Sequence, residues 1–216
     1  MNNFKAVLFD LDGTLIDSEH FYFSNWAPIL SDAYGLQITF EDWISNFAGH
    51  TLAHNVAMLN KDFNLKIDEQ EMWNATRASY AKADMRSIRL MPHAQELLEF
   101  VKSKGLTAAL VTSSYKATVD IVLGEHKLLD YFSFFVTRES VDQPKPNPEP
   151  YLLATKKLAM PSEHILVVED TRTGCTAAKE AGLFCVGVSK QEVERERLAH
   201  ADRLAYSLKE VESLFF

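Results

Sequence analysis

The 216-residue chain has little of several residue types, and each shortage argues against a class of protein. Its two cysteines, Cys175 and Cys185, are too few for a disulfide framework or a zinc cluster, so we expect buried free thiols and a reducing cytoplasm. Lys and Arg number 22 against 30 Asp and Glu, and the net charge of −8 argues against a broad basic face for nucleic acid. No apolar run is long enough to span a bilayer, and Met1–Phe9 does not read as a secretory leader.

The composition that remains is that of an ordinary globular protein. Hydrophobic residues make up 47% of the chain, which is enough for one main core and a smaller lobe, and we expect a monomer. Because the chain is acidic overall, an anionic substrate would need positive charge supplied locally, by a metal ion or by a few well-placed cations.

Alternating strand and helix patterns predict the fold class. Five short apolar runs are typical of buried strands: Lys5–Phe9, Thr107–Val111, Phe134–Val136, Ile165–Val168 and Cys185–Val188. Helical patterns lie between the later runs, at Ala94–Ser103, Val119–His126, Pro150–Leu158 and Thr173–Ala181. This alternation predicts an α/β fold with a doubly wound, Rossmann-like parallel sheet.

The segment between the first two strands does not fit this alternation. From Phe21 to about Ala83 it shows helical spacing without a convincing strand, and it is too long for a simple connection. We therefore predict a core made of residues 1–16 and 88–216, with a helical domain inserted over residues 17–87. Pro28 interrupts the first helical pattern, which predicts a kink or a late start there.

Acidic residues follow two of the predicted strands. Asp10 and Asp12 are two residues apart after the first strand, so their side chains can point to the same side, and Gly13 permits a turn. Glu169 and Asp170 end another strand. Each pair alone could be a solvated turn or a helix cap. Together, at the carboxyl ends of parallel strands, they predict a site for a hard cation such as Mg²⁺.

Two further features suggest that an anion is bound at the same edge. Thr112 and Ser113 follow a strand and precede a helix, where hydroxyls and free backbone N–H groups bind anions, although an N-cap is the simpler explanation. Lys145 lies between alternating prolines, which hold a loop extended and limit the freedom of its lysine. A structural linker with an incidental lysine is the alternative.

The four motifs, in this order and with a domain-sized insertion after the first, resemble the haloacid dehalogenase superfamily of phosphotransferases. The resemblance covers essentially the whole chain and is greatest to the members with a small helical cap, the branch of β-phosphoglucomutase and sugar-phosphate phosphatases. It implies a cytoplasmic, Mg²⁺-dependent phosphatase that acts on a small-molecule phosphate ester, without a nucleic-acid or membrane partner. A sugar or polyol phosphate is the expected substrate, with phosphoglycolate or a nucleotide as the alternatives.

The resemblance also implies a role for each motif residue. Asp10 matches the nucleophile that becomes an aspartyl phosphate, and Asp12 matches the general acid and base. Thr112 and the backbone at Ser113 match the phosphate-binding motif, and Lys145 matches the lysine that steadies the transferring group. Mg²⁺ would be held by Asp10, Asp12 through its main-chain oxygen, Glu169 and Asp170. In the cap, Tyr22, Gly49 and His50 are candidates for substrate selection.

Departures from the family pattern bear on the alternatives. Mutases resembling this chain carry a His at the position of Tyr22 and an Arg at that of Leu52, so the sequence favours a phosphatase over a β-phosphoglucomutase-type mutase. Dehalogenases and phosphonate-cleaving relatives lack the second carboxylate that Asp12 supplies. A non-catalytic binding protein on the same fold is disfavoured because all four motifs are intact.

Overall fold

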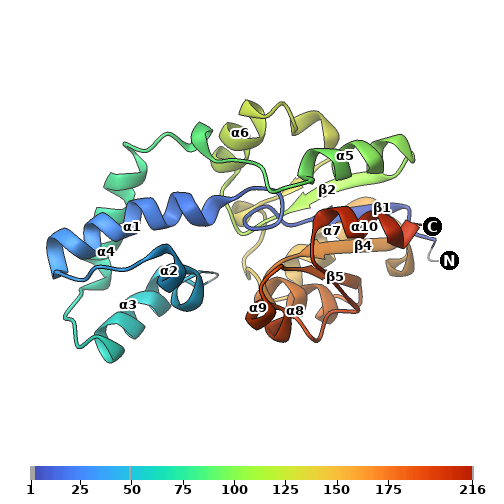
Figure 1. Ribbon diagram of the computed structural model, residues 1–216. Helices are drawn as coiled ribbons and strands as arrows, with labels where there is room; N and C mark the ends of the chain where they lie inside the picture. The colour runs from blue at the N-terminus through green and yellow to red at the C-terminus, as the bar shows by residue number, and fades with distance from the viewer. Residues whose placement is uncertain (1–2, 49, 216) are drawn as a thin grey trace. The chain divides into compact units, whose positions relative to one another are not determined.

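The computed structural model describes residues 3–48 and 50–215, and the chain forms two compact units (Figure 1). One unit comprises Met1–Asp17 and Arg89–Phe216, and the other comprises Ser18–Ile88. No helix among the described residues has the length and apolar character needed to cross a membrane.

The first unit is built on a six-stranded parallel sheet, which confirms the predicted fold class. The strands are β1 (Ala6–Phe9), β2 (Thr107–Val111), β3 (Phe135–Val136), β4 (Ile165–Glu169), β5 (Phe184–Val188) and β6 (Arg203–Ala205). Their order across the sheet is β3-β2-β1-β4-β5-β6, with β1 at the point where the chain reverses direction across the sheet. Ligands of open α/β sheets bind beyond the carboxyl ends of the strands at such a point.

Helices cover the sheet because both faces of its strands are apolar. The helices of this unit are α5 (Ala94–Ser103), α6 (Lys116–Glu125), α7 (Glu149–Leu158), α8 (Arg172–Glu180), α9 (Glu192–Arg197) and α10 (Leu208–Val211). Helices α7 and α8 pack together, and Tyr151, Cys175 and Ala178 from them share a core with Leu8 and Val167 of the strands. The other residues of each strand point to the opposite face. Helices α5 and α10 also pack against each other (Figure 1).

The cysteines agree with the prediction from composition. Cys175 and Cys185 are both free and buried, and both belong to the core between α8 and the sheet. They therefore act as small apolar side chains in this core.

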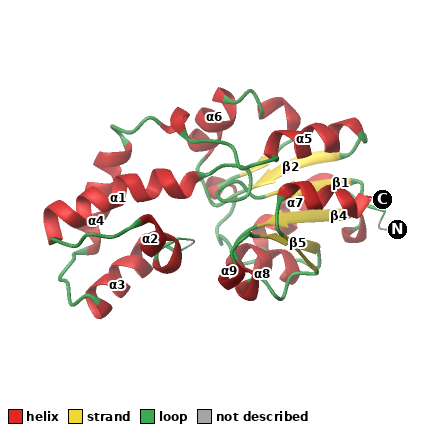
Figure 2. Cartoon of the chain, viewed as in Figure 1, coloured by secondary structure: helices red, strands yellow, loops and turns green. Residues whose placement is uncertain are grey.

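The second unit consists of helices in its described residues, 18–48 and 50–88, as Figure 2 shows. They are α1 (Ser18–Tyr34), α2 (Phe40–Asn46), α3 (Leu52–Asp62), α4 (Glu69–Tyr80) and a 3₁₀ turn at Met85–Ser87. The side chains of Thr39, Thr51 and Asp68 each accept a backbone hydrogen bond at the start of a helix, which explains where α2, α3 and α4 begin.

The helical unit has its own apolar core. Trp26, Trp43 and Leu59 are buried there, and the indole nitrogen of Trp43 donates a hydrogen bond of 2.6 Å to Glu19 Oε2. Of the two outcomes expected at Pro28, the late start is wrong, because α1 begins at Ser18 and Pro28 lies inside it, and the kink stays a prediction. Tertiary packing of its buried residues holds the helix on both sides of the proline.

Candidate active site

The register of the sheet brings the first and last motifs together. Phe9 at the end of β1 pairs with Leu110 of β2 on one side and with Val168 of β4 on the other. The pairing continues for one residue, because the amide of Asp10 donates a hydrogen bond of 3.0 Å to the carbonyl of Val168. Asp10 and Glu169, which follow these paired residues, therefore lie beside each other at the carboxyl edge.

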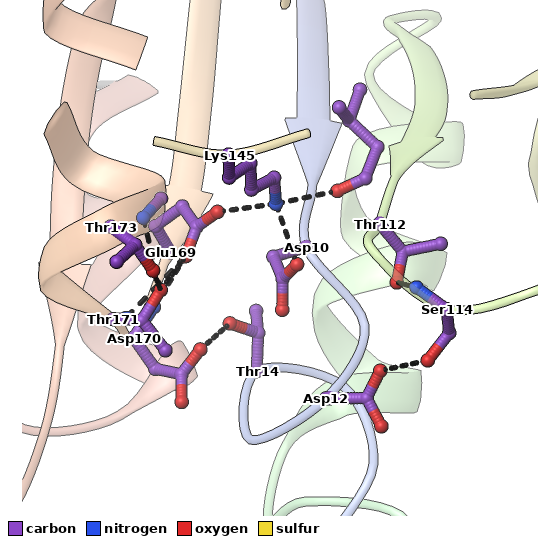
Figure 3. A network of polar contacts seen from close by, with 12 residues as sticks. Asp10, Asp12, Thr14, Thr112, Ser114, Lys145, Glu169, Asp170, Thr171 and Thr173 are labelled. Carbon is purple, nitrogen blue, oxygen red and sulfur yellow. Dashed lines mark hydrogen bonds and ion pairs between the residues drawn. The ribbon is translucent and has the colours of Figure 1, made fainter. Parts of the chain in front are cut away.

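Lys145 joins these two carboxylates (Figure 3). Its Nζ donates hydrogen bonds to Asp10 Oδ1 at 2.7 Å, to Glu169 Oε1 at 2.5 Å and to the carbonyl oxygen of Val111 at 2.8 Å. Burial works against the charge on Lys145, but Asp10 and Glu169 outweigh burial and raise the pKa of its ammonium group. The lysine therefore stays protonated and bridges the ends of three neighbouring strands.

The positive charge of Lys145 does not fully offset the surroundings that raise the pKa of Asp10. Burial is the largest influence and raises the pKa of Asp10 well above its ordinary value, with Lys145 opposing the rise. The neighbouring carboxylates of Glu169 and Asp12 raise it further. A nucleophilic carboxylate must be ionised, so this group of side chains needs another cation to act at neutral pH.

Glu169 is completely buried and is held by donors on both of its carboxylate oxygens. Oε1 accepts from Lys145 and from the hydroxyl of Tyr151, the latter at 2.7 Å. Oε2 accepts from the amide of Asp170 at 3.2 Å, and from the amide and hydroxyl of Thr171 at 3.4 and 3.1 Å. This buried charge is thus fully hydrogen-bonded, as a charge in a protein interior must be.

The turn after β1 brings Asp170 into contact with the first motif. Gly13 has a φ of +83°, a backbone conformation that other residues rarely adopt. A Cβ added there would lie 2.0 Å from Asp170 Oδ2, so a larger residue would also clash. The hydroxyl of the buried Thr14 donates to Asp170 Oδ1 at 2.9 Å. Asp170, which directly follows β4, therefore lies beside the Asp10–Thr14 turn, although it is 156 residues from Thr14 in the sequence.

The hydroxyl motif lies beyond β2, next to this turn. Thr112 is buried, and its Oγ1 accepts a hydrogen bond of 2.9 Å from the amide of Ser114, which leaves its own proton for another acceptor. Ser113 between them is exposed. The hydroxyl of Ser114 donates to Asp12 Oδ2 at 2.6 Å. The predicted anion-binding residues and the predicted carboxylates thus share one edge of the sheet (Figure 3).

The three candidates for substrate selection belong to the helical unit. Tyr22 packs with Phe21 and Tyr80, at ring-centroid distances of 6.0 and 5.9 Å. The ring of His50 stacks on that of His54 at 4.2 Å. Gly49 lies outside the described residues. Substrate selection by these residues stays a prediction.

The donor set at the sheet edge fits a divalent metal ion. Asp10, Glu169 and Asp170 offer carboxylate oxygens that all lie within 4.8 Å of one another. Oxygen-only ligands suit Mg²⁺. Burial and, after it, the neighbouring carboxylates raise the pKa of Asp10, and the positive charge of such an ion would favour its ionised form.

Three supporting residues were missed by sequence reasoning. Thr14, Tyr151 and Thr171 hold the motif carboxylates through their hydroxyl groups. Thr14 and Thr171 are each within five residues of a motif carboxylate, so proximity could have suggested them. Tyr151 reaches Glu169 from helix α7, and no local pattern marks that contact.

Comparison with known proteins agrees with this fold and site. The family model described as haloacid dehalogenase-like hydrolase matches residues 7–188. A phosphorylated carbohydrates phosphatase of Thermotoga maritima is 31% identical over 179 residues, covering 83% of this chain and 82% of the relative. A validoxylamine A 7'-phosphate phosphatase of Streptomyces hygroscopicus subsp. limoneus is 32% identical and covers 96% of each chain.

Solved structures give the same fold. A Thermotoga maritima protein provisionally named a β-phosphoglucomutase aligns with a TM-score of 0.75 and 29% identity, over 98% of each chain. A haloacid dehalogenase family hydrolase from Deinococcus radiodurans aligns with a TM-score of 0.83 and 23% identity, over 100% of this chain and 96% of that one.

The chain belongs to the haloacid dehalogenase-like hydrolase family. Its enzyme class is that of the phosphoric monoester hydrolases, as the resemblance of its motifs implied.

Proposed function

We propose that this chain is an Mg²⁺-dependent phosphatase that hydrolyses a small sugar or polyol phosphate through an aspartyl phosphate on Asp10. The observation that carries this proposal is the Lys145 bridge between Asp10 and Glu169. It fixes a carboxylate at the strand edge beside Thr112 and Asp12, with a positive charge against Asp10 Oδ1. That arrangement suits covalent phosphoryl transfer.

In the first step, Asp10 attacks the phosphorus atom of the ester. Lys145 holds Oδ1, so the attacking electron pair comes from Oδ2. The bond between phosphorus and the ester oxygen breaks, and Asp12 supplies the proton that the leaving alcohol needs. The hydroxyl of Thr112 and the backbone at Ser113 bind the phosphoryl oxygens, and Lys145 offsets the charge that spreads over them.

In the second step, water replaces the alcohol. Asp12, now ionised, takes a proton from a water molecule whose oxygen attacks phosphorus. The bond to Asp10 then breaks, which releases phosphate and restores both carboxylates to their starting state. One residue thus acts as acid in the first step and as base in the second.

We assign Asp10, Asp170 and the main-chain oxygen of Asp12 as the direct ligands of Mg²⁺. Glu169 adds negative charge and holds Lys145, because both of its carboxylate oxygens already accept protein hydrogen bonds. When bound, the ion would neutralise the crowded carboxylates and the phosphoryl group that they face. This refines the set expected from the sequence, in which Glu169 was a ligand.

The proposed substrate class is supported by the relatives. Two relatives that are more than 30% identical are named for phosphorylated carbohydrates and for validoxylamine A 7'-phosphate. Relatives named phosphoglycolate phosphatase, at 29 and 30% identity, keep that small ester as the alternative.

The test is a substrate panel with purified protein and Mg²⁺. Release of inorganic phosphate is measured from sugar phosphates, polyol phosphates, phosphoglycolate and nucleotides, with the Asp10→Asn variant as the matched blank. We expect a sugar or polyol phosphate to give the highest kcat/KM, and the variant to release no phosphate above background. Failure of every ester to release phosphate, or equal release by the variant, would contradict the proposed function.

A further inference from the structure

Ser114 has a hydroxyl group that contacts the other loop of the site. Its Oγ donates a hydrogen bond of 2.6 Å to Asp12 Oδ2 (Figure 3), although the two residues are 102 positions apart. They follow β2 and β1, which are neighbours in the sheet. A hydroxyl that donates to a carboxyl oxygen at this distance makes a strong hydrogen bond, both when the carboxyl carries a proton on its other oxygen and, charge-assisted, when it is ionised.

The backbone of Ser114 is fixed on both sides. Its amide donates to Thr112 Oγ1 at 2.9 Å, and its carbonyl oxygen accepts from the amide of Arg138 at 3.0 Å. Thr112 is anchored in turn, because its own amide donates to the carbonyl of Val136 at 2.9 Å. These bonds attach Ser114 to the ends of β2 and β3, so its short side chain has little freedom beyond rotation about χ1.

Asp12 gains a defined orientation from this contact. With Oδ2 held by Ser114, rotation of the carboxyl group is restricted, and we assign the exchange of a proton with substrate to Oδ1. The proton of the Ser114 hydroxyl is directed at Asp12, so the same proton is not available to bind a phosphoryl oxygen. The role that fits these contacts is orientation of the general acid rather than capture of phosphate.

We propose that Ser114 is a positioning residue for proton transfer by Asp12, a role that rests on the proposed phosphatase function. As the ester bond breaks, its electron pair stays on the leaving oxygen, which takes the proton from Asp12 Oδ1. Ser114 keeps its own proton throughout and holds Oδ2. Without this hydroxyl, Asp12 would still be present but would sample other rotamers, and proton transfer would slow.

Leaving groups of different basicity distinguish this role from other roles of Ser114. An alkyl phosphate expels a strongly basic alkoxide and depends on the general acid, whereas p-nitrophenyl phosphate expels a stable phenolate that needs little protonation. The value of kcat/KM covers steps up to departure of the alcohol, so it isolates the step in which Asp12 donates. The experiment compares kcat/KM for the best polyol phosphate and for p-nitrophenyl phosphate.

For Ser114→Ala we expect kcat/KM to fall about 10-fold or more on the alkyl ester, as part of the general-acid contribution is lost. On p-nitrophenyl phosphate the loss should stay within about 3-fold, for the same reason. The inhibition constant of inorganic phosphate should not change. Ser114→Thr keeps the hydroxyl and should restore the alkyl ester rate. The control is Ser103→Ala on α5, whose hydroxyl binds the carbonyl of Phe100 at 2.7 Å.

Two results would overturn the role of Ser114 while leaving the phosphatase intact. Equal losses on both esters with weaker inhibition by phosphate would make Ser114 a phosphate ligand, and unchanged kcat/KM on both would give it no role. If Ser114→Ala fails to fold, Ser114→Thr and Ser114→Cys, which differ in donor strength, give the same comparison of leaving groups. A wild-type protein that hydrolyses neither ester would instead overturn the proposed function, and this role with it.

Discussion

The hydroxyl of Tyr151 donates a 2.7 Å hydrogen bond to Oε1 of Glu169, and both side chains are completely buried. The same carboxylate oxygen accepts from Lys145, whose Nζ also lies 5.0 Å from the centre of the Tyr151 ring. Tyr151 therefore helps to hold Glu169 in the bridge that Lys145 makes to Asp10, although Tyr151 is on helix α7 and outside the motifs.

Tyr151→Phe should weaken both stability and metal use. Loss of one donor to a buried carboxylate costs about 1–3 kcal/mol of folding free energy, since water cannot reach that oxygen to replace the hydrogen bond. For a protein of this size, that corresponds to a fall in Tm of roughly 2–12 °C. We also expect a higher Mg²⁺ concentration for half-maximal activity, because Glu169 and Lys145 lose a restraint.

Thermal unfolding and a Mg²⁺ titration of activity measure these effects. The control is Tyr206→Phe, which removes the hydroxyl of a half-exposed tyrosine and keeps the ring that Arg195 covers at 3.6 Å. The control should resemble wild type in both assays. A Tyr151→Phe variant that also resembled wild type would show that Lys145 alone is enough to hold Glu169.

Gly174→Ala should lower both stability and activity, although helix propensity alone predicts a gain in stability. Replacing a helical glycine by alanine normally stabilises a protein by about 0.5–1 kcal/mol. In α8, however, a Cβ at position 174 would lie 1.9–2.1 Å from the carboxyl atoms of Glu169, which is hydrogen-bonded and buried. We expect Tm to fall and activity to drop at least about 10-fold as the carboxylate is displaced.

Gly124→Ala is the matched control for this effect. Gly124 lies in α6, and a Cβ there would meet its nearest neighbour, the side chain of Leu129, at an ordinary 3.7 Å. This variant should keep full activity and gain stability by about 0.5–1 kcal/mol. If both variants gained stability equally, α8 would not approach the carboxyl group of Glu169 as closely as the structure shows.

The main features of this site follow from chemistry that is local in the sequence. Carboxylates and hydroxyls directly after apolar runs predicted Asp10, Thr112 and Glu169 at one edge, because parallel strands end together. The sheet then placed them in register. The sixth strand was missed because Arg203–Ala205 is only three residues long, and its burial runs from exposed to buried along its length.

Contacts between distant segments could not be predicted in the same way. Ser114 and Asp12 meet because β1 and β2 are neighbours with a fixed register. Tyr151 reaches Glu169 because α7 packs against β2, β3 and α8 and shares a core with Val167 of β4. Neither contact leaves a periodic or compositional mark. The predicted late start of α1 at Pro28 failed for a related reason. Burial of Trp26 and Leu30 on either side of the proline outweighs its unfavourable helix propensity.

Asp10→Asn should remove turnover and raise the stability of the metal-free protein. Burial raises the pKa of Asp10 in the fold, so the folded state holds a proton that the unfolded chain releases near the usual value of 3.8. Stability from this group is therefore complete below that pH and is lost as pH rises through the folded-state pKa. Asparagine at position 10 carries no charge and keeps an oxygen that can accept from Lys145, so the variant does not lose this stability as the pH rises.

The measurement is Tm of both proteins in EDTA, between pH 4 and 8. The advantage of Asp10→Asn should be small near pH 4 and grow with pH, reaching several degrees, since about 1 kcal/mol shifts Tm by about 2–4 °C in a chain of this size. An advantage that stayed constant with pH would mean that Asp10 is not the titrating group. Residual turnover near wild type would contradict the covalent step.

Removal of metal should abolish activity. EDTA should stop phosphate release and added Mg²⁺ should restore it, because Lys145 alone does not balance the carboxylates around Asp10. Ca²⁺ should inhibit, since its larger and looser coordination shell misplaces the phosphoryl group. BeF₃⁻ with Mg²⁺ should bind tightly as a mimic of the phosphorylated Asp10. Full activity after exhaustive metal removal would exclude the proposed role of Asp170.

The phosphatase and mutase alternatives differ in what attacks the phosphorylated Asp10. A mutase must hold a second phosphate away from the reacting one and let a sugar hydroxyl compete with water. The positions where mutases carry His and Arg hold Tyr22 and Leu52 here. Tyr22 packs against Phe21 and Tyr80 in the helical unit, and Leu52 is the first residue of α3. Neither residue supplies a positive charge for a second phosphate.

We therefore expect inorganic phosphate to be released stoichiometrically from the best substrate, without activation by glucose 1,6-bisphosphate. The measurement follows phosphate release from β-glucose 1-phosphate alongside formation of glucose 6-phosphate. Isomer that formed much faster than free phosphate would make the chain a mutase, and another cation of the helical unit would have to bind the second phosphate. His50 would be the first to replace, because it lies two residues before Leu52, the position where mutases carry Arg.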